Sequence, residues 1–368
     1  MRWLLYILCL LTIGCTSTQK ADSEALTPYY TPKYATSFSI ATDSLDRKVI
    51  LITNPYQSDK PTEQRLYLLR EGQSAPAGEQ SLRLPAQRIA CLSTSHIAML
   101  DAIGAAERIV GVSGVKFVTN SDVKSRAVEI GYDSALDFER LKAVGTDLIL
   151  LYGLYGEQSS MTTKLAQLGI PYIYIGDYIE PSPLGKAEWM VALAALCDMQ
   201  SRGEECFTAL ESRYNDLKQS VVAVEPRPKV MLNTPYRDTW FMPPVGSYMV
   251  QLITDAGGEY IYPQNRSRES QPISLEQALL LCNAADVWIN VGQSQSLEAL
   301  KRENPKFASV PAVVSGRVYN NTKRTTSAGG SDFWESGAVN ADIVLRDMIN
   351  ILHHNALTDS LYYYQQLQ

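Results

Sequence analysis

The chain has 368 residues, 45% of them apolar and 20% charged, a globular composition with room for two or three domains. Disordered, collagen-like and coiled-coil classes are thereby excluded. Lys and Arg total 33 against 39 Asp and Glu, so the formal charge is -6 and the chain lacks the basic surface that duplex nucleic acid requires. No nucleic-acid partner is expected.

The N-terminal residues are typical of an export signal. After Arg2, residues 3–14 are almost wholly apolar, a run too short to span the ~30 Å hydrocarbon core of a bilayer. The run ends at Cys15 before a polar stretch, which resembles a bacterial lipobox with Thr12 where Leu is usual. We expect a signal peptide at 1–14 and a lipidated tether at 15–26, on the periplasmic face of a bacterial membrane. A secreted protein with a chance Cys is the alternative.

Cysteine usage indicates no metal site. Once Cys9 leaves with the signal and Cys15 carries lipid, four cysteines remain: Cys91, Cys197, Cys206 and Cys282. No CxxC, HExxH or Cys/His cluster is present, so no metal ligand is predicted. In an oxidising compartment a Cys197–Cys206 disulfide and two free thiols are equally compatible with the spacing.

Residues 27–85 predict a β-rich extension. Short apolar runs occur at 34–40, 49–52 and 65–69, and turn-forming residues separate them. We expect an antiparallel set of strands.

From Arg88 onward, short apolar strands alternate with helices of period 3.6, which predicts largely parallel sheets covered by helices. The first series has strands at 89–92, 109–112, 147–151 and 172–175, with helices at 95–103, 138–144 and 160–168. The second has strands at 229–233, 259–262, 286–291 and 317–319, with helices at 248–256, 275–282, 296–303 and 338–353. We therefore expect an α/β fold of two lobes, at 86–201 and 226–368.

A weak internal repeat relates the two lobes, and a helix is predicted between them. Residues 137–150 parallel 274–289, each with a capping residue, Glu, a short helix, Asp and a strand. Between the lobes, Ser201 and Glu204 have capping-box spacing and open an apolar stripe. A helix over 202–225 would be roughly 30 Å long. Because one stiff helix is a poor hinge, we expect little relative movement of the lobes.

These motifs together resemble a known family. The strand and polar loop of residues 88–96, followed by 100–113, resemble the opening of substrate-binding proteins of ABC importers for ferric siderophores, haem and cobalamin. The likeness continues through 136–151, 256–258, 275–291 and 310–319, and it covers about residues 86–352. It implies the helical-backbone periplasmic binding protein fold, with ligand bound between two lobes joined by a rigid helix. It also implies a permease partner, no catalytic residues and no resident cofactor.

In that family one exposed Glu on each lobe meets Arg on the permease, and the matching positions are Glu139 and Glu276. Two carboxylates at equivalent places would fix the register of docking. The alternative is local, because each Glu lies in the first turn of a predicted helix. There the helix dipole alone favours a carboxylate by ~0.3–1 kcal/mol.

Loops at the carboxyl ends of the parallel strands should line the cleft. The ligand-binding candidates there are Ser95, His96, Lys116, Tyr155, Tyr236, Arg237, Trp240, Arg324 and Trp334. Aromatic rings would stack on a planar ligand and cations would neutralise an anionic one. We favour Trp240 and Trp334 for stacking, and core packing for Phe241, Phe333 and Tyr152. His96 fits either a haem-iron ligand or, more commonly at a helix start, a capping or packing residue.

The sequence thus predicts a lipid-anchored, monomeric receptor that captures a bulky metal chelate and delivers it to an ABC importer. A ferric siderophore ranks first because Lys116, Arg237, Lys323 and Arg324 lie in the candidate loops beside aromatic residues; cobalamin and haem follow. An exported enzyme is one alternative, although the chain has no G-x-S-x-G, G-x-G-x-x-G or P-loop motif. A cell-surface interaction lipoprotein, using the N-terminal strands as its contact surface, is the other.

Overall fold

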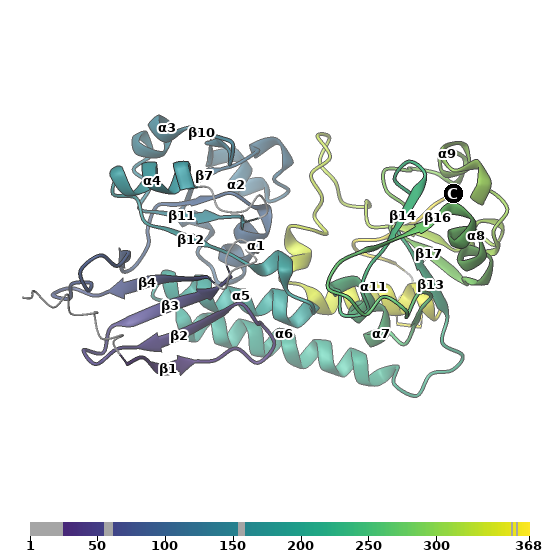
Figure 1. The fold of residues 1–368 in the computed structure, drawn as a ribbon, viewed down its shortest axis with the longest axis horizontal. Coiled ribbons are helices and arrows are strands. Elements are labelled where there is room, and N and C mark those ends of the chain that lie inside the picture. Colours follow the sequence, from purple (N-terminus) through teal and green to yellow (C-terminus); the bar gives the residue numbers. More distant parts are fainter. Residues whose placement is uncertain (1–24, 55–61, 154–158, 355, 358–359) are drawn as a thin grey trace, which may run out of the picture.

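Two α/β lobes lie side by side, with a separate N-terminal sheet beneath the first lobe (Figure 1). The computed structural model describes residues 25–54, 62–153, 159–354, 356–357 and 360–368. Within this part of the chain no helix combines the length and apolarity needed to cross a bilayer. The predicted lipidation site Cys15 lies outside the described residues.

The first lobe is built on a parallel sheet, as predicted. Its strands run in the order β12-β11-β6-β7-β8, and they are β6 Ile89–Cys91, β7 Ile109–Val112, β8 Val128–Glu129, β11 Leu148–Leu151 and β12 Tyr172–Tyr174. The helices are α1 Thr94–Ala102, α2 Ser121–Arg126, α3 Phe138–Ala143 and α4 Ser159–Gln167. A short ladder of β9 Gly131–Tyr132 and β10 Ala135–Leu136 precedes α3.

The second lobe repeats this plan. Its sheet has the order β15-β13-β17-β18-β19, with β13 Lys229–Leu232, β15 Glu259–Tyr260, β17 Val287–Ile289, β18 Val318–Asn320 and β19 Gln365–Gln366. Only β19 is antiparallel. The helices are α7 Tyr248–Asp255, α8 Leu275–Ala284, α9 Leu297–Glu303, α10 Pro311–Val314 and α11 Ala341–Leu352. The antiparallel pair β14 Thr239–Met242 and β16 Gln271–Ser274 lies apart from the sheet.

The internal repeat has the same physical basis in both lobes. Asp137 caps α3 and Ser274 caps α8, each accepting a hydrogen bond from a backbone N–H three residues on. After α3, Asp147 accepts from the backbone N–H just before β6 at 3.0 Å. After α8, Asp286 accepts from the first N–H of β13 at 2.7 Å. Each helix is therefore fixed at one end by its cap and is followed by an Asp that binds the first strand of its lobe.

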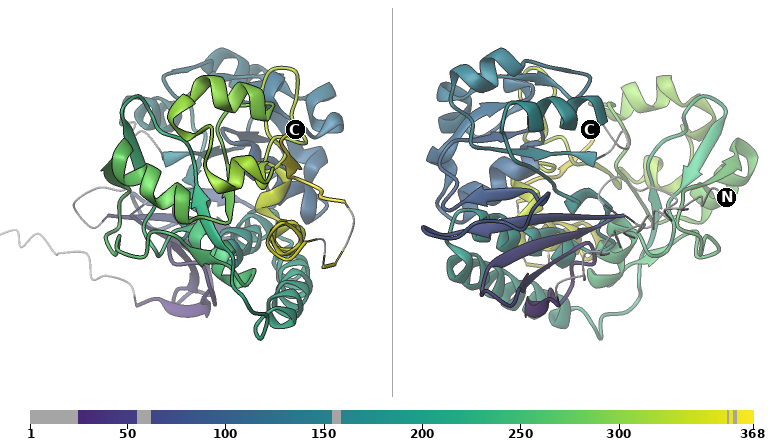
Figure 2. Two further views of the ribbon diagram at one scale, coloured as in Figure 1. Left: turned by 90° about the vertical axis from the view of Figure 1, so that its right-hand side faces the viewer. Right: turned by 60° about the vertical axis from the view of Figure 1, so that its left-hand side comes forward.

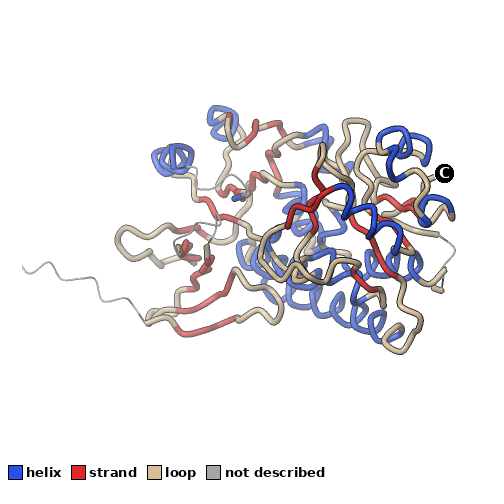
Figure 3. The backbone as a smooth tube through the Cα atoms, turned by 45° about the vertical axis from the view of Figure 1, so that its right-hand side comes forward, coloured by secondary structure: helices blue, strands red, loops and turns tan. Residues whose placement is uncertain are grey.

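Helix α6, Gln200–Ser220, runs from beneath the first lobe to the second (Figure 1). It begins before the predicted 202 and ends before 225. Its N-cap is Met199, which makes no side-chain hydrogen bond, so the predicted capping box at Ser201 is wrong. Helix α11 packs against α6 and, with it, bridges the lobes; Figure 2, left, looks along α11 with α6 beside it. In Figure 3 these helices form the blue row along the lower edge.

Helix α5, Pro183–Leu196, is buried along its whole length, and the sequence did not predict it. It packs against α1, against α6 and against one face of the N-terminal sheet. The ring of Trp189 contacts Phe38 of that sheet at a centroid distance of 4.8 Å. The helix has no polar stripe because protein covers every face of it.

The N-terminal extension forms a five-stranded sheet in the order β1-β2-β3-β4-β5, seen below the first lobe in Figure 2, right. The strands are β1 Thr27–Tyr30, β2 Phe38–Thr42, β3 Lys48–Thr53, β4 Glu63–Leu69 and β5 Ser81–Arg83. The pairing is antiparallel except between β4 and β5, which corrects the predicted all-antiparallel set. The side-chain amide of Gln64 bonds the backbone of edge strand β12 at Tyr172 and Tyr174, and so attaches this sheet to the lobe.

A buried carboxylate holds the segment between β1 and β2. Glu188 of α5 accepts hydrogen bonds of 2.7–2.8 Å from the backbone N–H groups of Lys33, Tyr34 and Ala35, and from the hydroxyl of Tyr30. These donors compensate the desolvation of a carboxylate with an exposed fraction of only 1%.

Cys197 and Cys206 are both free thiols in the structure, so no disulfide joins them. Cys197 is buried, and burial raises the pKa of its thiol to about 11. Cys206 is partly exposed on α6.

Replacing Glu188 with Gln should lower the free energy of unfolding by about 2–4 kcal/mol. The amide keeps the size of the side chain but presents an NH2 group to backbone donors that need an acceptor. Urea denaturation measures the loss. The matched control is Glu205→Gln on α6, whose side chain is 68% exposed and should matter by less than about 0.5 kcal/mol. Equal losses in the two variants would contradict the anchoring role of Glu188.

Candidate functional site

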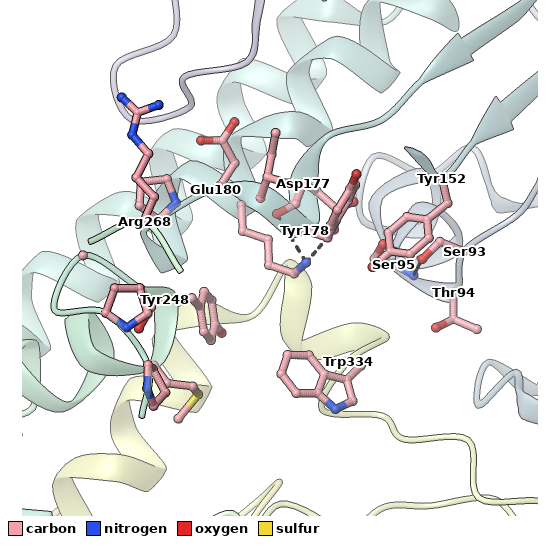
Figure 4. A pocket seen from close by; sticks show the side chains of 18 residues that line it. Ser93, Thr94, Ser95, Tyr152, Asp177, Tyr178, Glu180, Tyr248, Arg268 and Trp334 are labelled. Atoms are coloured by element: carbon pink, nitrogen blue, oxygen red, sulfur yellow. Dashed lines mark hydrogen bonds and ion pairs between the residues drawn. The ribbon is translucent and has the colours of Figure 1, made fainter. Parts of the chain in front are cut away.

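A cavity of about 690 Å³ lies between the lobes at the carboxyl ends of β6, β11 and β12 (Figure 4). This is the end of a parallel sheet at which ligands bind in α/β proteins. The first lobe contributes the loop after β6, the residue after β11 and the segment 177–181 after β12. The second lobe contributes the turn before α7, the start of α7, and two separate side chains. The principal lining residues are Ser93, Thr94, Ser95, Tyr152, Asp177, Tyr178, Glu180, Lys186, Tyr248, Met249, Arg268 and Trp334.

Aromatic rings line both sides of this cavity. Tyr152 and Tyr178 of the first lobe pack with ring centroids 4.4 Å apart. Trp334 and Tyr248 come from the second lobe, and Trp334 is 49% exposed (Figure 4). Burial raises the pKa of the Tyr248 phenol, so it remains a neutral hydrogen-bond donor. The walls therefore suit a ligand with flat apolar faces.

The charged groups of the cavity differ in whether they are already paired. Lys186 of α5 donates to Asp177 at 2.6 Å, and Glu180 accepts from Trp189 and from the N-terminal segment. Arg268 is exposed and makes no ion pair with any residue that the structure describes. Of the two cations among the described residues that line the cavity, Lys186 has an acidic partner and Arg268 has none.

His96 lies below the cavity rather than on its surface. Its ring is 0% exposed, its Nε2 is 3.8 Å from the carboxylate of Asp177, and it contacts the ring of Tyr152 edge-on. Burial lowers the pKa of His96 to about 4, and the charge of Asp177 opposes this only in part. His96 is thus a neutral packing residue, and its predicted role as a direct ligand contact is wrong for this arrangement.

The predicted role of Trp240 in stacking on a ligand is also wrong, because the side chain lies in the core. Its ring is 0% exposed, packs against Trp288 and Phe307, and donates from Nε1 to the backbone oxygen of Leu232 at 2.9 Å. Its neighbour Phe241, predicted to be in the core, is 43% exposed. Strand β14 alternates inward and outward, and Trp240 takes the inward place.

The predicted cleft cations do not line this cavity. Lys116 lies over the ring of Phe117, and Arg237 lies over the 65% exposed ring of Tyr236 at a turn outside it. Arg324 is paired with Asp332 at 2.5 Å and lines a separate polar hollow of about 440 Å³. Of the nine predicted contacts, Ser95 and Trp334 line the cavity, and Tyr155 lies outside the described residues.

Core packing is confirmed for Phe333, 2% exposed, whereas Tyr152 is half-buried: it packs against the core of the first lobe and also lines the cavity. The cavity residues that were missed differ in their sequence signals. Asp177 follows β12, so the strand-end rule that selected other loops applies to it too. Lys186 is a charge within an apolar run, which indicates a buried partner. Arg268 has no such signal, because it lies in an irregular loop before β16.

The lobes also touch at the separate polar hollow, next in sequence to the cavity residue Trp334. Glu335, only 2% exposed, accepts from the backbone N–H groups of Thr119 and Asn120 at 2.8 and 2.7 Å. Asp332 accepts from the hydroxyl of Thr119 at 3.0 Å. Burial raises the pKa of Glu335, and the bonds from the first lobe oppose the rise. Trp334 is thus held between two residues that are anchored to the opposite lobe.

Glu139 and Glu276 are both exposed, in the first turns of α3 and α8. Backbone and Ser274 hydrogen bonds lower the pKa of Glu276, as expected for a carboxylate at a helix start. Among the described residues no group of three His, Cys, Asp or Glu side chains is placed to hold a metal ion.

Two α/β lobes with largely parallel sheets, and a cavity between them, define a two-lobed ligand-binding protein. Residues 89–325 match the family described as periplasmic binding protein, and the chain belongs to this family. The N-terminal sheet lies outside the matched segment.

Similar proteins agree with this assignment. An uncharacterized lipoprotein of Methanocaldococcus jannaschii is 25% identical over 335 residues, which are 83% of this chain and 78% of that protein. A periplasmic heme binding protein from Pseudomonas aeruginosa has a TM-score of 0.59 at 16% identity, over 77% of this chain and 98% of that one. A periplasmic vitamin B12 binding protein of Vibrio cholerae has a TM-score of 0.53 at 16% identity, over 73% and 97%. At these identities the solved structures show the fold alone.

The neutral, buried state of His96 predicts a pH-dependent stability. Between pH 6.5, its ordinary pKa, and pH 4, the unfolded chain binds a proton that the folded protein does not, so stability falls as the pH drops through this range. From pH 7 to pH 5 the parent should lose about 2 kcal/mol more than His96→Gln does. Urea denaturation at the two pH values measures this difference. His354→Gln, at an exposed histidine, is the control. Equal losses in the parent and His96→Gln would refute the interpretation.

Proposed function

We propose that the protein is a receptor, lipid-anchored through Cys15, that binds a bulky anionic metal chelate in the interlobe cavity and delivers it to an ABC importer. The proposal includes no catalytic step. One observation carries the choice of ligand: an unpaired guanidinium, Arg268, on a cavity whose walls bear Tyr152, Tyr178, Tyr248 and Trp334.

The charge argument rests on which groups still have bonding capacity. Asp177 is paired through Oδ2 with Lys186, although its Oδ1 has no hydrogen-bond partner, and Glu180 accepts from backbone, hydroxyl and indole donors. Arg268 has donors to spare, and guanidinium groups bind carboxylates, phosphates and other oxyanions in a bidentate manner. The hydroxyls of Ser93, Thr94 and Ser95 add neutral contacts. This combination supports an anionic, partly aromatic ligand.

Within that class we rank a ferric siderophore first, because it joins negative charge to flat aryl groups. Cobalamin would use the rings but leave Arg268 without an anionic partner. Haem would need an iron ligand, and with His96 buried beneath the cavity the phenols of Tyr152, Tyr178 and Tyr248 remain as candidates. Solved proteins of this fold are described as heme or vitamin B12 binding, which supports a ligand of this size.

A fluorescence screen tests the proposal. Trp189, Trp240 and Trp288 are buried, whereas Trp334 faces the cavity, so a bound ligand should quench mainly Trp334. The probes are a ferric catecholate, a ferric hydroxamate, hemin and cyanocobalamin. We expect saturable quenching by a ferric chelate that is lost in Trp334→Phe. No saturable binding of any probe, confirmed by calorimetry, would overturn the proposed function.

Arg268→Ala should weaken the binding of an anionic probe by about 10- to 100-fold, the scale of a lost charge-assisted contact. Cyanocobalamin, as the uncharged comparison, should be affected little. The matched control is Arg266→Ala, in the same loop but not on the cavity. Equal effects of the two substitutions on the anionic probe would show that Arg268 acts only through the net charge of the loop.

Glu139 and Glu276 are proposed as the permease contacts. Glu139→Ala and Glu276→Ala should leave the affinity for the chelate unchanged. Each should weaken association with the permease by more than the ~0–1 kcal/mol of an exposed ion pair, if the contacts are partly desolvated. Association is measured with the importer in nanodiscs. Loss of stability with unchanged association would instead favour a helix-dipole role.

A further inference from the structure

The N-terminal sheet lies outside the segment that matches the family, yet its chain reaches the cavity wall. We propose that this sheet is part of the scaffold of the ligand site and that Thr36 is a positioning residue for the cavity segment 177–181. That the cavity is a ligand site rests on the function proposed above. The positioning of segment 177–181 by Thr36 can be measured without any ligand.

The segment 177–181 forms one wall of the cavity and is fixed at both ends. At its start, the ion pair of Asp177 with Lys186 ties it to α5. At its end, Glu180 lines the cavity with an exposed fraction of 3%. Tyr178, which packs against Tyr152, lies between these two fixed points. The position of the Tyr178 ring therefore depends on both attachments.

The attachment at Glu180 is made largely by the N-terminal extension. The backbone N–H of Thr36 donates to both carboxylate oxygens, at 2.9 and 3.0 Å, and its hydroxyl donates to Oε2 at 3.0 Å. The backbone N–H of Ser37 adds a bond of 3.2 Å, and the indole of Trp189 in α5 one of 2.9 Å. A buried carboxylate takes its position from such donors, because leaving it without them is costly.

Thr36 can position Glu180 because it is itself held on both sides. Before it, the backbone of Lys33 to Ala35 is bound by Glu188. After it, Phe38 begins β2 and packs against Trp189 at 4.8 Å. Glu188 and Trp189 both belong to α5, the helix that also carries Lys186. The extension and the cavity segment are thus anchored to the same buried helix.

The arrangement also bears on ligand selectivity. Glu180 is a carboxylate on the wall of a cavity that also presents Arg268 (Figure 4). With its oxygens occupied by Thr36, Ser37 and Trp189, Glu180 has little capacity left to bind that guanidinium. The extension therefore helps to keep Arg268 available for an anionic ligand.

The test removes the side-chain donor that the N-terminal extension contributes to Glu180, which leaves the backbone donors in place. Thr36→Val deletes the hydroxyl bond to Glu180 and keeps the shape. Thr36→Ser keeps the hydroxyl and should rescue. Ser37→Ala is the matched control, because the Ser37 hydroxyl contacts only the Thr36 hydroxyl, at 3.4 Å, and its removal leaves the bond from Thr36 to Glu180 in place. Hydrogen–deuterium exchange of the ligand-free protein should be faster at residues 177–180 in Thr36→Val, by about three- to tenfold, and unchanged in the two controls.

The affinities for the ferric catecholate, hemin and cyanocobalamin are measured on the same variants, together with thermal melting. We expect weaker binding of whichever probe binds the parent, again by about three- to tenfold, with melting temperatures close to the parent value. Exchange at 177–180 that is the same in Thr36→Val and Ser37→Ala would overturn the positioning role. Failure of every probe would count against the proposed function alone, since exchange still decides this inference.

Discussion

The burial of α5 on every face is the constraint on which the rest of the structure depends. A helix in this position must bring its charged and polar side chains to partners, because a buried ion without one costs several kcal/mol. Lys186 meets Asp177 at the cavity, Glu188 binds the N-terminal segment, and Trp189 donates to Glu180. Residues 186–189, about one turn of α5, thus join the cavity wall to the extension.

Both lobes have a five-stranded, largely parallel sheet, but the strand orders differ and the lobes contribute to the cavity in different ways. In the first lobe, the strand-end loops after β6, β11 and β12 line it directly. In the second lobe, the chain leaving β13 turns at Tyr236 and forms the β14–β16 ladder, which folds Trp240 inward onto Trp288. The cavity is lined there by the start of α7 instead. A rule based on strand ends therefore works for one lobe and fails for the other.

Burial also explains which elements and cavity residues the sequence predicts and which it does not. The two lobes, most of their strands and helices, and the capped repeat at Asp137 and Ser274 are confirmed, because these elements carry the periodicity of half-buried structure. Helix α5 was missed because a helix buried on all sides has no polar face to set a period. Trp240 was misplaced because residues 236–241 were expected to form a cleft loop, whereas Thr239–Met242 form β14 and place the ring in the core. Arg268 reaches the cavity only through tertiary folding of an irregular loop.

The contacts between the lobes bear on how a ligand can enter and leave. Along one side α6 is fastened to the second lobe, with Tyr214 and Lys218 bound to Asp255 and Arg213 to Asp342. At the separate polar hollow Glu335 is bound to two backbone N–H groups of the first lobe. Separating the lobes would break bonds to a buried carboxylate, each worth roughly 1.5–3 kcal/mol.

A receptor held on both sides gains little from closing around its ligand, so its affinity must come from walls that are already in place. This is why the fixed ends of segment 177–181 matter. In a cavity that does not remodel itself, the placement of Tyr178 and Glu180 before the ligand arrives determines how well the ligand fits, and that placement is set by α5 and the N-terminal sheet.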